Sequence, residues 1–182
     1  MLVLIVGRGL SASGGDLKEA QRQFLAGNYA RSLARAEEAL QGKQDNEEWQ
    51  LLRSRALLTL GRYPEARAAI TNALALDRWS IRLRWQAREV LLSNGQTDAA
   101  REMTEAVIGL VSRYSSDYRA AADLVVVGQA ALETGADPKR VLDTVFEAAR
   151  KADPKLREVY LASGGLALEK HDFALAAKRF EE

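Results

Sequence analysis

The sequence contains no cysteine and a single histidine among its 182 residues. Without cysteine the chain can form neither a disulfide nor a thiolate metal site. The lone histidine, His171, cannot build a multi-histidine metal site either. A catalytic serine would need His171 or a lysine as its base, and no serine motif of this kind is present. We therefore expect a protein that is not an enzyme, with no catalytic residue, no cofactor and no metal ion.

The sequence also lacks a large excess of one charge and any long hydrophobic run. Lysine and arginine total 26 and aspartate and glutamate total 25, which leaves a net charge of +1. A chain so close to neutral has no strong electrostatic attraction for nucleic acid or for an anionic membrane. No stretch approaches the roughly 18 apolar residues of a membrane helix. The sequence therefore predicts no nucleic-acid partner and no integral membrane segment.

Residues 1–15 are interpreted as a separate N-terminal tail. The apolar run Leu2–Val6 is followed by small residues, an order that resembles the end of a secretory signal peptide. The run is short, Arg8 interrupts it, and no basic leader precedes it. Two interpretations stay open. Either residues 1–13 are a signal remnant and the protein is exported, or they are an unstructured tail, as is common at termini, and the protein is cytoplasmic.

What the sequence does contain is a repeat. Gly27, Gly61 and Gly95 are spaced 34 residues apart, and the residues around them repeat in phase, with an aromatic or threonine two positions later. Gly135 and His171 continue the series at intervals of 40 and 36 residues. A fixed period of this length indicates a stack of two-helix units, each of which buries its apolar face against its neighbours.

The repeat resembles the second half of a tetratricopeptide repeat (TPR). Residues 61–66 read Gly-x-Tyr-x-x-Ala, and apolar residues follow at Ile70, Ala73 and Leu74. The resemblance covers residues 16–182 and implies an all-α, right-handed α-solenoid of about five antiparallel helix hairpins. The small residue that the family places in each first helix is Ala20 or Ser54 in two units, whereas Arg88 replaces it in the third. Units four and five diverge and are equally compatible with generic helical hairpins.

Capping residues and helix breakers give the expected helix boundaries. Asp16 with Glu19, for example, has the spacing of a capping pair, and glycines end several helices. The expected helix starts include Asp16, Asp45, Ser116, Asp137 and Asp153. The last helix, from Asp172, stops without the apolar residues that should follow Phe180. We therefore expect part of a longer protein, with an unfinished C-terminal edge from which the isolated segment frays or through which it self-associates.

The best candidate for a binding site is the predicted fifth helix. Residues spaced 4, 3 and 4 apart would share one of its faces: Arg78, Arg82, Trp85 and Glu89. In the TPR family the first helix of each unit lines a concave groove. The resemblance therefore implies that residues ten and six before each turn residue point into it: Leu17, Gln21, Leu51, Arg55, Trp85, Glu89, Val125, Gln129, Leu161 and Gly165.

From this set we select five partner-binding candidates: Arg55, Arg82, Trp85, Glu89 and Gln129. They could hold an extended peptide by stacking, apolar burial and hydrogen bonds to its backbone. In the alternative, Trp85 packs between repeats while the arginines lie over apolar neighbours.

The favoured function is a non-catalytic scaffold that binds a protein or peptide through its concave face. A second hypothesis is an accessory repeat region of an enzyme, such as a hydrolase, whose catalytic domain lies beyond residue 182. A third is a structural spacer whose groove is filled by its own side chains.

Overall fold

The computed structural model describes residues 14–42 and 46–182, and every regular element within these ranges is helical. The interpretation of residues 1–13 as a signal remnant lies outside the described residues. In the first three units the helices are α1 (Gly14–Leu25), α2 (Tyr29–Gln41), α3 (Glu47–Thr59), α4 (Tyr63–Leu76), α5 (Ile81–Ser93) and α6 (Thr97–Arg113). The last two units contain α7 (Ala121–Glu133), α8 (Pro138–Arg140), η1 (Val141–Phe146), α9 (Glu147–Ala152), α10 (Arg157–Glu169) and α11 (Phe173–Glu181).

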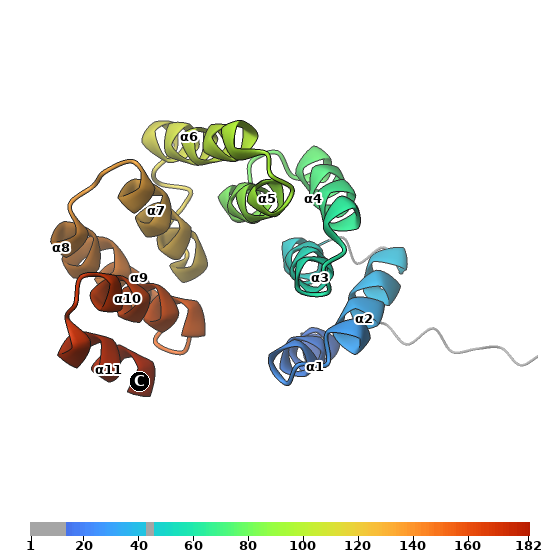
Figure 1. Ribbon diagram of the computed structural model, residues 1–182, viewed down its shortest axis with the longest axis horizontal. Coiled ribbons are helices and arrows are strands. Elements are labelled where there is room, and N and C mark those ends of the chain that lie inside the picture. The colour runs from blue at the N-terminus through green and yellow to red at the C-terminus, as the bar shows by residue number, and fades with distance from the viewer. Residues whose placement is uncertain (1–13, 43–45) are drawn as a thin grey trace, which may run out of the picture.

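The hairpins follow one another along a curve (Figure 1). In this view α1, α3, α5 and α7 lie on its inner side, and α2, α4 and α6 lie outside them. The element α8–η1–α9 is one continuous helix with a π-helical middle, a geometry that accommodates an inserted residue. It lies in the unit between Gly135 and His171, where the interval is 36 rather than 34 residues.

The five predicted turns are confirmed. Gly27, Gly61, Gly95 and Gly135 have φ between 73° and 91°, and His171 has φ of 61°. At each turn the amide of the following residue donates to the carbonyl five residues back, for example Asn28 N to Gln23 O over 2.9 Å. This bond is characteristic of a helix that ends with a left-handed residue, and glycine adopts that conformation without steric cost.

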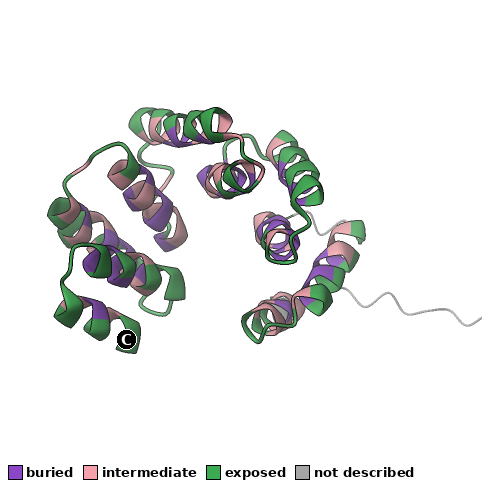
Figure 2. Cartoon of the chain, viewed as in Figure 1, coloured by how far each residue is buried: buried purple, intermediate pink, exposed green. Residues whose placement is uncertain are grey.

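The core lies where neighbouring hairpins meet (Figure 2). Its largest cluster joins α2, α3, α4 and α5, and its larger members are Leu33, Leu51, Leu57, Ile70, Leu83 and Val90. Each such side chain contributes about 1.5–3 kcal/mol when it is fully buried. The units therefore depend on one another for stability, as the short period predicts.

Units four and five contain a close helix contact that the sequence interpretation overlooked. Gly128 and Gly164 occupy the position seven residues before the turn, where the first two units have Ala20 and Ser54. A Cβ atom at Gly128 would lie 2.3 Å from the ring of Phe146, and one at Gly164 would lie 2.6 Å from the ring of Phe180. In both units an aromatic ring of the second helix thus packs directly on a glycine of the first.

Several expected helix starts are wrong. The first helix begins at Gly14, so Asp16 lies in its first turn. Asn46 caps α3, accepting a hydrogen bond from the amide of Trp49 over 3.0 Å, and Asp45 lies outside the described residues. Asp137 does cap α8, where its carboxylate accepts from the amide of Arg140 over 2.7 Å.

The two largest errors are at the starts of α7 and α10, and they have a tertiary and a local cause respectively. The helix expected at Ser116 begins at Ala121, because Tyr118 donates its hydroxyl to Trp79 O of the preceding unit over 2.9 Å and holds the segment outside a helix. The helix expected at Asp153 begins at Arg157. There the carboxylate of Asp153 accepts from the amide of Lys155, and the hydroxyl of Tyr160 donates to Pro154 O.

Candidate functional site

The candidate site is the inner face, defined as the inward-facing side of α3, α5, α7 and α10. At its centre is Arg82 of α5, whose side chain is 18% exposed. Its guanidinium Nη1 lies 2.7 Å from Glu47 Oε2 and 2.5 Å from Glu48 Oε1, both at the start of α3. Ser80, which caps α5, also donates its hydroxyl to Glu47. The charged end of Arg82 is thereby fixed to the neighbouring unit.

A third carboxylate, Asp123 of α7, faces the same guanidinium. Burial raises the pKa of Asp123 above its usual range, and the charges of Glu47 and Glu48 raise it further, while Arg82 lowers it. For Arg82, burial alone would lower the pKa, but the hydrogen bond to Glu48 and the surrounding carboxylates raise it overall. One cation and three carboxylates therefore meet between α3, α5 and α7.

Arg55 of α3 joins three units. Its Nε donates to Gln86 Oε1 of α5 over 3.2 Å, and its Nη1 lies 3.9 Å from Glu158 Oε1 of α10. The side chain remains 44% exposed, yet enough protein surrounds it that desolvation lowers its pKa, with Glu158 opposing this effect. Side chains of the second, third and fifth units thus form one connected polar surface.

Trp85 is half-buried, and much of its ring packs between units. It contacts the cluster of Ile81, Val107, Val126 and Ala130, which joins α5, α6 and α7. The guanidinium of Arg88 lies over the ring, 4.7 Å from its centre, and Arg88 Nε donates to Glu133 Oε2 of α7 over 2.8 Å. This arrangement matches the packing alternative, in which an arginine covers an apolar neighbour.

The remaining candidates are distributed along the same helices. Glu89 is exposed and pairs with Arg88, and Gln129 is half-buried on α7. Arg78 does not lie on α5 as expected, because Asp77 accepts hydrogen bonds from the amides of Trp79 and Ser80 and holds that stretch in a turn. The helix starts only at Ile81.

The sequence interpretation missed the carboxylates of the inner face. Glu48, Arg82 and Glu158 each lie thirteen residues before the turn residue of their unit. The alignment of the repeats therefore showed a charged residue at the same position in three units, which could have identified them. Over residues 14–42 and 46–182, no group of histidine and acidic side chains has the arrangement of a metal site. Over the same ranges no helix combines the length and apolar character needed to cross a membrane.

Comparisons with known proteins show the fold. No family model matches the sequence, and no curated protein matches it. The structure of TTC0263, a thermophilic TPR protein of Thermus thermophilus, aligns with 92% of this chain and 88% of its own at a TM-score of 0.63 and 14% identity. The predicted TPR fold, an all-α solenoid of antiparallel hairpins, is therefore confirmed.

Two further solved structures are similar over most of their length. MamA 41-end from Desulfovibrio magneticus RS-1 is 20% identical, with 96% of this chain and 94% of that chain covered and a TM-score of 0.49. YrrB, described as a TPR protein with an unusual peptide-binding site, is 17% identical, with 91% and 81% covered and a TM-score of 0.44.

Proposed function

We propose that this chain is a non-catalytic scaffold that binds an extended segment of a partner protein along its inner face. The proposed contact residues are Arg55, Arg82, Trp85, Glu89 and Gln129. The observation that carries the proposal is the contact of Arg55 with both Gln86 and Glu158, which makes one polar surface out of three units. A surface of this kind spans several residues of an extended chain, and stacked repeats characteristically provide such surfaces.

The chemistry of the inner face suits a peptide backbone. Gln129, which is half-buried, carries an amide that can both donate to and accept from a peptide group. Gln86 is buried, and its amide oxygen accepts from Arg55 and holds that guanidinium in place. The exposed ion pair of Arg55 with Glu158 contributes about 0–1 kcal/mol, so a partner that supplies its own charged groups displaces it at little cost. The solvent-facing part of Trp85 adds apolar contact area beside these polar groups.

Site-directed photo-crosslinking tests the proposal. A photoreactive residue replaces Glu89 on the inner face or, as a matched control, the exposed Glu102 on the outer helix α6. We expect extracts of the native host to give a specific crosslinked protein only with the probe at Glu89. The double variant Arg55→Ala with Arg82→Ala should weaken its capture by about tenfold or more. Equal crosslinking from Glu102, or capture unchanged in the double variant, would reject the inner face as the site.

A further inference from the structure

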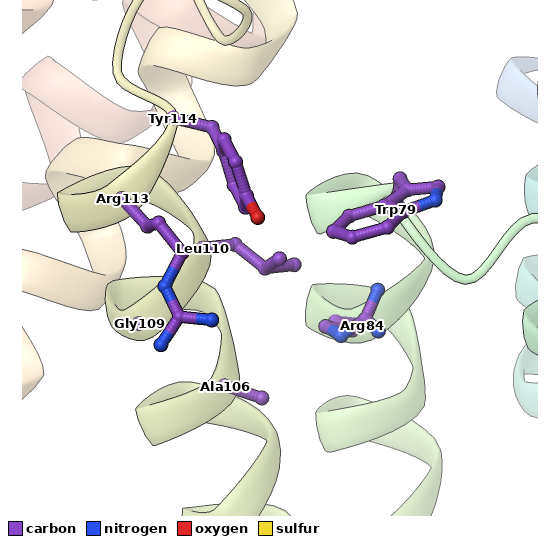
Figure 3. Close-up of a pocket in the computed structure, with 7 residues that line it drawn as sticks. All are labelled: Trp79, Arg84, Ala106, Gly109, Leu110, Arg113 and Tyr114. Atoms are coloured by element: carbon purple, nitrogen blue, oxygen red, sulfur yellow. The ribbon is translucent and has the colours of Figure 1, made fainter.

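A pocket on the opposite side of α5 is independent of the inner face. Its volume is about 280 Å³, and it lies between α5 and α6 (Figure 3). Arg84 lines it from α5, whereas Arg82 and Gln86 belong to the inner face. Since successive residues of a helix are about 100° apart, Arg84 lies about 200° around the helix from each of those two. The other lining residues are Trp79, Ala106, Gly109, Leu110, Arg113 and Tyr114.

Two exposed aromatic rings form the apolar end of this pocket. Trp79 is 51% exposed, and its ring meets that of Tyr114 edge to face, with centres 5.6 Å apart and planes at 90°. The backbone of Trp79 is held from two sides, because Asp77 accepts from its amide and Tyr118 donates to its carbonyl. The ring is therefore presented to solvent from a fixed backbone. Gly109 leaves space beside it, since a Cβ atom there would meet no atom within 4 Å.

The charged groups of the pocket are arginines without carboxylate partners. Arg55, Arg82 and Arg88 on the inner helices all have ion pairs, whereas none of the ion pairs found over residues 14–42 and 46–182 involves Arg84 or Arg113. Arg84 Nη1 donates to the carbonyl of its own helix cap, Ser80 O, over 3.0 Å. Burial lowers the pKa of Arg84, while Tyr118 and Asp77 oppose this effect.

We propose that the α5–α6 pocket binds an acidic segment of a partner protein. A carboxylate of the segment pairs with Arg84 and Arg113, and an adjacent large apolar side chain fills the space between Trp79, Tyr114 and Leu110. The pocket is smaller than the roughly 300–1,000 Å³ of most small-molecule sites, so it fits one or two side chains of a docked chain. Guanidinium groups match carboxylates in geometry as well as charge, and edge-to-face rings offer a rigid apolar anchor.

Fluorescence anisotropy with a defined probe tests this site. The probe is a short fluorescent peptide in which glutamates flank a central leucine, and its control is the same peptide with glutamines in place of the glutamates. We expect measurable binding of the acidic peptide and at least tenfold weaker binding of the neutral one. Absence of acidic-peptide binding at about 1 mM, or equal binding of the two peptides, would overturn the proposal.

Three variants locate the binding on the protein. Gly109→Leu fills the pocket without a backbone clash, and the double variant Arg84→Gln with Arg113→Gln removes its charge; each should weaken binding tenfold or more. The control Arg140→Gln removes an exposed arginine from α8 and should bind normally. Circular dichroism and thermal melting confirm that each variant is folded. Unchanged affinity in either pocket variant contradicts the assignment.

Two more measurements distinguish this pocket from the inner face and from a nucleic-acid site. The inner-face variant Glu89→Ala should bind the acidic peptide normally. The test of the pocket is therefore independent of the test of the proposed function. A single-stranded oligonucleotide of the same length tests the other anionic class of macromolecule. If it binds more tightly than the peptide and loses affinity in Gly109→Leu, the pocket serves nucleic acid and the proposal of a protein partner is wrong.

Discussion

The guanidinium Nη1 of Arg55 lies 3.9 Å from the carboxylate Oε1 of Glu158, so the second unit reaches the fifth across the inner face. Both side chains are nearly half exposed, and such pairs contribute little to the free energy of unfolding. We infer that the pair instead restrains the curvature of the repeat stack. A weak contact between distant units narrows the range of shapes that a quasi-one-dimensional stack can adopt.

The Arg55–Glu158 contact predicts a salt-sensitive shape. We expect Glu158→Gln to broaden and lengthen the distance distribution between α3 and α10 while it leaves the melting temperature nearly unchanged. Because the sequence has no cysteine, cysteines introduced at the exposed Thr59 and Glu169 can be spin-labelled specifically. Pulsed electron resonance then measures the distance distribution between the two labels. The unmodified protein at high salt should resemble the variant, since salt screens exposed charges. Identical distributions in all three samples would show that the pair does not restrain the stack.

The turn at His171 predicts a stabilising substitution. His171 is the one described non-glycine residue with positive φ, at 61°, and this conformation costs an L-residue about 1 kcal/mol or more. His171→Gly should therefore raise the free energy of unfolding by up to about 1 kcal/mol, whereas Gly95→Ala should lower it by a similar amount. Chemical denaturation of both variants measures the two effects. A destabilised His171→Gly variant would mean that the ring contact with Phe173 outweighs the backbone strain.

The environment of Asp123 predicts a pH-dependent gain in stability. Burial raises its pKa in the folded protein above the ordinary value of 3.8, so ionisation of this group disfavours folding as pH rises through that interval. Asp123→Asn should therefore be more stable than the unmodified protein at neutral pH. The difference should be complete above the folded pKa, should shrink as pH falls from the folded pKa toward the ordinary value, and should be absent below the ordinary value. Melting temperatures of the variant and the unmodified protein across the acid range test the sign of this stability difference. A variant less stable at neutral pH would show that attraction to Arg82 outweighs the cost of burying the Asp123 carboxylate.

Local conformation was predictable because it depends on few residues. A turn that needs positive φ selects glycine almost regardless of its surroundings, and the register of the repeat extended the prediction to His171. The starts of α7 and α10 were not predictable in this way. They depend on the hydroxyl of Tyr118, which precedes α7 and donates to Trp79 O of another unit, and on the hydroxyl of Tyr160 in α10, which donates to Pro154 O before that helix.

The candidate site was only partly predictable for a related reason. The face of α5 that carries Arg82 and Trp85 follows from helical periodicity. The carboxylates of Glu47 and Asp123 come from other units, and they reach Arg82 only through the packing of α3 and α7 around α5. The pocket beside Trp79 was missed because an exposed aromatic in a turn has no periodic signature.

The C-terminal edge predicts weak self-association, one of the two outcomes that the sequence interpretation gave for it, the other being fraying. Phe173 and Phe180 of α11 are 63% and 51% exposed, and Leu168 of α10 is 49% exposed. Exposed apolar side chains at the end of a repeat stack favour contact with another chain. Phe173→Glu should therefore shift any concentration-dependent oligomer toward monomer in sedimentation velocity, while Tyr63→Glu, at an exposed aromatic on α4, should not. A monomer at all concentrations, with slow hydrogen exchange throughout α11, would contradict the prediction.

Trp85 distinguishes binding from packing most directly. If it anchors a partner, Trp85→Ala should weaken partner capture by more than tenfold, since buried aromatic anchors contribute about 2 kcal/mol or more at interfaces. Helicity should then stay nearly intact. If Trp85 serves chiefly to join α5, α6 and α7, the variant should lose stability instead, by an amount approaching the roughly 3–5 kcal/mol of an emptied tryptophan site. Its half-buried position against Val107 and Val126 favours a substantial share of the second effect.

Thermal melting and capture of the crosslinked partner, measured on the same Trp85→Ala protein, separate the two roles. The variant Arg88→Gln provides the matched control, because it removes the guanidinium above the ring and leaves the ring itself in place. A packing role predicts that Trp85→Ala melts far below Arg88→Gln and that capture falls only where the protein unfolds. A binding role predicts lost capture by Trp85→Ala at temperatures where both variants are folded. A folded variant that binds its partner unchanged would remove Trp85 from the contact surface, leaving Arg55, Arg82, Glu89 and Gln129.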